Sequence, residues 1–147
     1  MLDLSAAARQ FPDDPDWTWL AWFWAPGGLF RQGLMLEAIA ADAAGRLACL
    51  ATPYARYDGG PVLAADTALE WMAQLGRVDI LPLAPAYLAD EAGADIADPV
   101  RILNYADLVI IPPVPGWRRS ACVWRAACCA LDRMKPVCVL NGGEADG

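Results

Sequence analysis

Short apolar runs alternate with segments of helical spacing along the chain after residue 45. The runs are five or six residues long and consist mostly of Val, Ile, Leu and Cys, which is typical of strands buried on both faces of a parallel sheet. In one of the intervening segments Leu69, Met72 and Leu75 share a helix face, and Gly76 follows as a stop signal. The predicted strands are Arg46–Ala51, Val78–Leu83, Asp107–Ile111 and Pro136–Leu140, and the predicted helices are Val62–Leu75, Ile96–Ala106 (after Asp95 as a cap) and Ser120–Met134 (with Ser120 as N-cap). Strands that alternate with helices imply right-handed crossovers and a three-layer α/β domain over residues 46–147.

The first 45 residues differ in character, and we expect them to form a helical extension packed on the domain. The range 28–44 is predicted to be one amphipathic helix, bounded by Pro26-Gly27-Gly28 and by Gly45. Ahead of it, five aromatic residues crowd eight positions. They are compatible with a segment capping the sheet or with an oligomer interface, where aromatic residues are enriched. A role at a membrane surface is a third interpretation, but the segment lacks the basic face that such helices use. The five are Trp17, Trp19, Trp22, Phe23 and Trp24.

Composition narrows the possible chemistry. The 147 residues carry a net charge of −7, which argues against nucleic-acid binding through phosphate contacts. There is no His, which excludes a Ser-His-Asp triad, His-ligated metal and a His general base. The five cysteines form no CxxC pair and lie mostly in apolar runs, so we expect free thiols in a reducing cytoplasm, with no metal and no cofactor. Four Asp among the first 16 residues predict that no signal peptide is present, and Arg31 and a Pro-Gly-Gly break make 17–36 a poor membrane span.

Ligands of open parallel sheets bind at the carboxyl ends of the strands, so the residues that follow each predicted strand are the candidates. Thr52, Pro53, Tyr54 and Asp58 follow the first strand and could meet a sugar or a base; an ordinary βα turn is the alternative. Asp98 could hold a ligand hydroxyl or simply favour a helix dipole. After the third strand, Trp117 offers a stacking surface. Arg118, Arg119 and Ser120 lie at the predicted start of a helix, which attracts anions; a solvated loop is the alternative.

These residues resemble a known family. Ala51-Thr52-Pro53-Tyr54 after one strand, Asp98 nine residues before Asp107, and Pro115-Gly116-Trp117-Arg118-Arg119-Ser120-Ala121 after a later strand are similar to motifs of the nucleoside 2-deoxyribosyltransferase-like superfamily. The nearest branch is the group of small bacterial proteins called DUF1937. The resemblance covers about residues 46–140. It implies a flavodoxin- or Rossmann-like parallel sheet of four or five strands, with a nucleoside-type pocket at its carboxyl edge.

The resemblance also implies roles for single residues. In the transferases a Glu on a helix attacks the anomeric carbon and forms a covalent glycosyl-enzyme, as in retaining glycosidases. Tyr54, Asp98, Trp117 and Ser120 match pocket residues, but Ala126 stands where the family has that Glu, and Cys122 stands where it has Gly.

We therefore expect a binder of a nucleoside- or nucleotide-like ligand that lacks the nucleophile. One alternative is an enzyme that cleaves N-glycosidic bonds, with Asp98 as its catalytic carboxylate and Tyr54 as a second catalytic residue. The other is an assembly subunit. A homo-oligomer is expected, with no nucleic-acid or membrane partner.

Overall fold

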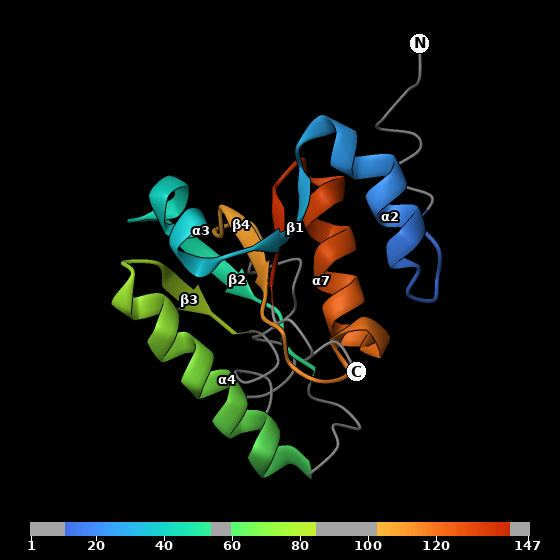
Figure 1. Cartoon of the computed structure of the whole chain (residues 1–147). Helices are drawn as coiled ribbons and strands as arrows, with labels where there is room; N and C mark the ends of the chain where they lie inside the picture. The colour runs from blue at the N-terminus through green and yellow to red at the C-terminus, as the bar shows by residue number, and fades with distance from the viewer. Residues whose placement is uncertain (1–10, 54–59, 85–102, 142–147) are drawn as a thin grey trace.

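A computed structural model describes residues 11–53, 60–84 and 103–141 of the chain. Five parallel strands form a single sheet in the order β1-β5-β4-β2-β3 (Figure 1). The fold is therefore the predicted α/β class. The strands are β1 (Phe30–Leu34), β2 (Leu47–Leu50), β3 (Leu81–Leu83), β4 (Leu108–Ile111) and β5 (Val137–Leu140).

Helices cover both faces of the sheet and complete three layers. Helices α2 and α7 lie on one face, and α3 and α4 lie on the other (Figure 1). Within β4, Val109 and Ile111 join the apolar cluster under α7, while Leu108 and Ile110 join the cluster under α4. Burial on both faces is what the uninterrupted apolar pattern of this strand predicts. The bounds are α2 (Trp17–Trp24), α3 (Leu36–Ala43), α4 (Gly60–Arg77) and α7 (Ala121–Asp132), with 3₁₀ turns η1 (Ala25–Gly27) and η2 (Trp117–Arg119).

The strand order is flavodoxin-like except that a different strand takes one of the outer places. From β2 onward, the strands follow the 2-1-3-4 part of the flavodoxin order 2-1-3-4-5. The outer place, which the last strand takes in that order, is filled here by the first strand, β1, which pairs with β5. Helix α4 connects β2 to β3 on one face, and α7 connects β4 to β5 in the opposite direction on the other face, as right-handed crossovers require.

The prediction of one helix over 28–44 is wrong. The segment contains β1 and α3, separated by an irregular stretch in which the β1–β5 register shifts between Arg31 and Leu34. Gly33 lies in this stretch at φ +69°, a conformation that suits glycine. The free backbone edge of β5 provides pairing partners that no local pattern in 28–44 reveals, and this tertiary contact outweighs helical periodicity.

The other predicted elements agree with the structure apart from their ends. All four predicted strands and the helices at 60–77 and 121–132 are present, and the four strands and α7 are shorter than predicted. In α4 the core side is formed by Ala64, Ala68 and Leu75, whereas Leu69, which was predicted to share a face with Leu75, is exposed. Most of the predicted helix 96–106 lies outside the described residues, and its described part forms a turn at 103–105. Within the described ranges, no helix has the length and apolar character needed to cross a membrane.

Candidate functional site

The strands β2 and β4 are neighbours whose chains depart in opposite directions, toward β3 and toward β5. The crevice at the carboxyl ends of such a pair is the place where open α/β sheets bind ligands. The register aligns Leu50 with Ile110, and the amide of Ala51 donates to the carbonyl of Ile110 at 3.0 Å. Continuing this register places Thr52 beside Pro112. The structure thus brings two of the predicted site residues, Thr52 and Pro53, to the switch point of the sheet.

Thr52 is the one fully buried polar side chain in the described part of the chain, with 2 % of its surface exposed. Its Oγ1 has no hydrogen-bond partner among the described residues. Leaving such a hydroxyl unpaired costs about 1–3 kcal/mol. Since a hydroxyl can both donate and accept, Oγ1 is suited to a polar group of a bound molecule.

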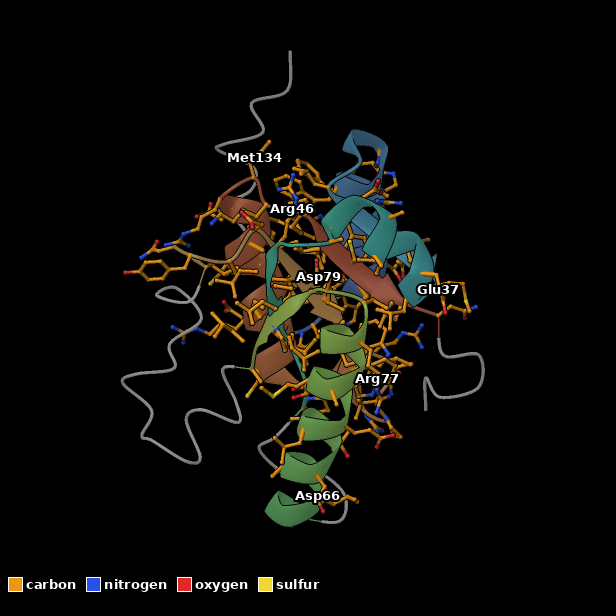
Figure 2. All side chains as sticks on the ribbon, turned by 90° about the vertical axis from the view of Figure 1, so that its left-hand side faces the viewer. Glu37, Arg46, Asp66, Arg77, Asp79 and Met134 are labelled. Atoms are coloured by element: carbon orange, nitrogen blue, oxygen red, sulfur yellow. The ribbon has the colours of Figure 1, made fainter. Side chains whose placement is uncertain are left out.

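Among the described residues, those beside Thr52 at the ends of β2 and β4 are uncharged and poor in donors. Pro53 and Pro112 are buried, Pro113 is half-buried, and none of the three has an N–H to offer. Two charged residues mark the opposite end of the sheet. Arg46 and Asp79 precede the neighbouring strands β2 and β3 (Figure 2), where the amide of Gly45 donates to the carbonyl of Asp79 at 2.6 Å. The described residues that follow β2 and β4 are therefore apolar around a single hydroxyl.

Ser120 caps α7 as predicted. Its Oγ accepts a hydrogen bond from the amide of Val123 at 3.3 Å, which satisfies one of the amides left open at a helix start. The turn ahead of it begins at Gly116, whose φ of +83° favours glycine. Because α7 follows β4, its start lies at the carboxyl edge of the sheet, on the α2 side.

The prediction that Trp117 is an exposed stacking surface is wrong. Only 2 % of its surface is exposed. The Trp17 ring meets it edge-on with centroids 4.9 Å apart, and the Arg118 guanidinium carbon lies 4.9 Å from the ring centroid. Burial between an aromatic ring and a cation is more favourable for an indole than exposure to water. Arg118 itself is exposed, and its carbonyl accepts a hydrogen bond from Trp17 Nε1 at 2.8 Å.

Three predicted site residues, Tyr54, Asp58 and Asp98, lie outside the described residues. Their roles at the carboxyl edge remain predictions.

Position 126 is part of the apolar core. Ala126 is buried in the cluster that α7 shares with α2 and the sheet. The one carboxylate on α7, Asp132, is exposed at its last residue. At 1.5 Å per residue it lies about 18 Å along the helix axis from Ser120. Helix α7 thus brings no carboxylate to the carboxyl edge.

The cysteines are free thiols, as predicted. Burial raises the pKa of Cys49 from its ordinary value of 9.0 to about 12, and the charge of neighbouring Cys129 adds to the rise. The same two causes, burial first, raise the pKa of Cys128 to about 12. Thiols held neutral in this way are poor nucleophiles. Within the described ranges no cluster of three or more Cys, Asp or Glu side chains could hold a metal ion.

Sequence reasoning missed two groups that shape this end of the molecule. Trp17 and Trp124 join the N-terminal segment to the start of α7 through hydrogen bonds. Lys135 Nζ donates to the carbonyls of Leu103 and, at 2.8 Å, of Ala106, which fixes the turn ahead of β4. The signal available for Lys135 was that it is the chain's only lysine.

No protein-family model, curated protein or solved structure matches the chain. The fold defines a parallel three-layer α/β protein with a flavodoxin-like strand order and a switch point between β2 and β4, where Thr52 lies.

Proposed function

We propose that the protein binds a nucleoside- or nucleotide-type small molecule at the carboxyl edge of its sheet, between β2 and β4. The observation that carries this proposal is the buried Oγ1 of Thr52, which has no partner among the described residues and lies at the switch point. A ligand with a donor or acceptor at this point would satisfy the hydroxyl.

The character of the crevice favours a planar, uncharged group next to Thr52. The rings of Pro53, Pro112 and Pro113 are apolar, as contact with the face of a heterocycle requires, and the hydroxyl provides orientation. The exposed Arg118 and Arg119 precede the N-terminus of α7, and both the guanidinium groups and the helix dipole favour an anion. A base at Thr52 with a sugar or phosphate toward α7 fits both features.

The proposed function is binding without covalent glycosyl transfer. Ala126 offers a methyl group where the resembled transferases carry their nucleophile, and Asp132 is at the far end of the same helix. A hydrolase that uses Asp98 to activate water is the enzymatic alternative. The alternative is tested by measuring how fast the wild type and Asp98→Asn release the free nucleobase from deoxynucleosides. Equal rates would exclude Asp98 as the general base.

A thermal-shift screen with nucleosides, nucleotides and sugar phosphates tests binding. A ligand at a hundred times its Kd adds about 2.7 kcal/mol to the free energy of unfolding. We expect Thr52→Val to abolish most of the ligand shift, with Thr67→Val on α4 as the matched control. No shift with any compound, or equal shifts in both variants, would contradict the proposal.

A second candidate function, as an assembly subunit, is favoured by one observation. Trp22 on α2 has 74 % of its surface exposed, and the uncharged residues 25–28 beside it are exposed as well. Sedimentation of the wild type and of Trp22→Ser tests it: a homo-oligomer formed through this surface dissociates in the variant, and a monomeric wild type excludes it.

A further inference from the structure

Two indole groups join the N-terminal strap, which we define as Phe11–Trp24, to the β4–α7 loop and to α7. From the strap, Trp17 Nε1 donates to the carbonyl of Arg118 at 2.8 Å. In the opposite direction, Trp124 Nε1 of α7 donates to the carbonyl of Pro12 at 2.9 Å. The two rings meet edge to face, with centroids 5.0 Å apart and planes at 87°. The contact is therefore reciprocal.

Trp17 holds two consecutive residues of the β4–α7 loop, Pro112–Ser120. Its N–H binds the carbonyl of Arg118, and its ring packs against Trp117 at 4.9 Å. The loop's own backbone bonds are local, from the amides of Trp117, Arg119 and Ser120 to carbonyls three residues earlier. Such short-range bonds define turns but do not orient the loop against the sheet. The strap residue Trp17 adds a long-range restraint, from 101 positions away in the chain.

We propose that Trp17 is a positioning residue, which fixes the β4–α7 loop and with it the Ser120-capped start of α7 at the carboxyl edge. Removal of its N–H loosens the loop, and removal of the ring uncovers Trp117. Ligand affinity responds because the loop borders the crevice; this second claim rests on the proposed function, whereas the first does not.

Trp17→Phe tests the inference, since it keeps one aromatic ring and removes the N–H donor together with the five-membered ring that carries it. Hydrogen exchange of the Trp117, Arg119 and Ser120 amides reports loop opening, and the Val109 amide, which is bonded to Pro136 in the sheet, reports global opening. We expect the loop amides to exchange about five-fold faster, the factor for one net hydrogen bond, with Val109 changed less. The control is Trp22→Ala, which removes an exposed indole from the same helix and leaves the loop unchanged.

The ligand arm uses whichever nucleoside or nucleotide gives the largest thermal shift with the wild type. Its Kd is expected to rise up to about five-fold in Trp17→Phe and to stay constant in Trp22→Ala. Equal acceleration of the loop amides and Val109, or the same loop effect in Trp22→Ala, would overturn the positioning role. An unchanged Kd would overturn the link to the site. If no compound binds the wild type, the proposed function fails, while the exchange data still decide the role of Trp17.

Discussion

Introducing a carboxylate at position 126 is the most direct way to ask what this position faces. Ala126 lies in the apolar cluster between α7, α2 and the sheet, so an introduced Glu side chain enters the core. Adding its atoms to a packed core costs about 1–3 kcal/mol. Burial also disfavours the charged form, and keeping a Glu neutral at pH 7, from an ordinary pKa of about 4.3, costs about 3.7 kcal/mol. Together these costs are comparable with the total stability of many domains, roughly 5–15 kcal/mol.

Urea unfolding of Ala126→Glu and Ala126→Gln at several pH values separates the two costs. Gln has nearly the same size and no charge, so it carries the packing cost alone. We expect the Glu variant to be less stable than the Gln variant by about 3–4 kcal/mol at pH 7 and by only about 1 kcal/mol near pH 5. The Glu variant is the less stable one at high pH because its folded state favours the neutral acid. The stability difference therefore grows as the pH rises above the pKa of Glu in the unfolded chain.

Ala121→Glu, at the exposed first turn of the same helix, is the control, and the helix dipole favours a negative charge there. The result that would refute the reasoning is equal stability of the Glu and Gln variants at pH 7. Equality would mean that a carboxylate at 126 reaches water or a cation, so that the position belongs to an open site rather than to the core.

Three further predictions concern single groups. Since burial raises the pKa of Cys49 from 9.0 to about 12, the stability that depends on its neutral thiol is complete below pH 9 and is lost as pH rises from 9 toward 12; urea midpoints above pH 9 should fall less steeply in Cys49→Ala than in the wild type. Lys135→Met leaves the carbonyls of Leu103 and Ala106 without their ammonium partner and should cost about 1.5–3 kcal/mol at neutral pH, measured by urea unfolding. Gly116→Ala places a Cβ at φ +83° and should destabilise by about 1 kcal/mol or more, visible as a lower Tm.

Elements held by local pattern were predictable from the sequence. Strand β4 reads as a continuous apolar run because both of its faces are covered, and Ser120 marks the start of α7 because its side chain caps an amide three residues on. The position of Thr52 after a predicted strand was enough to name it as a candidate site residue. That its hydroxyl has no hydrogen-bond partner among the described residues could be seen only in the structure. The prolines around it come from two separate loops, which no local pattern places together.

Features that depend on long-range packing were not predictable. Strand β1 is short, carries Arg31 and Gln32, and exists because β5 offers a free edge. Trp117 follows a Pro-Gly turn and reads as exposed, yet the N-terminal strap covers it across about a hundred residues of chain. In both cases the deciding partner is remote in sequence, and no window of local periodicity contains it.

The contact between the strap and the β4–α7 loop follows from the place of β1 in the sheet. A first strand that runs parallel to the others must be entered at the amino end of the sheet, so a helix packed before it has to start near the carboxyl end. Because β1 pairs with β5, this helix lies beside α7, the crossover that leads into β5 (Figure 1). Helix α2 therefore begins next to the start of α7, where Trp17 meets Arg118 and Trp124. Having the outer strand at the beginning of the chain rather than at its end thus brings the N-terminal segment to the carboxyl edge, where open α/β sheets bind ligands.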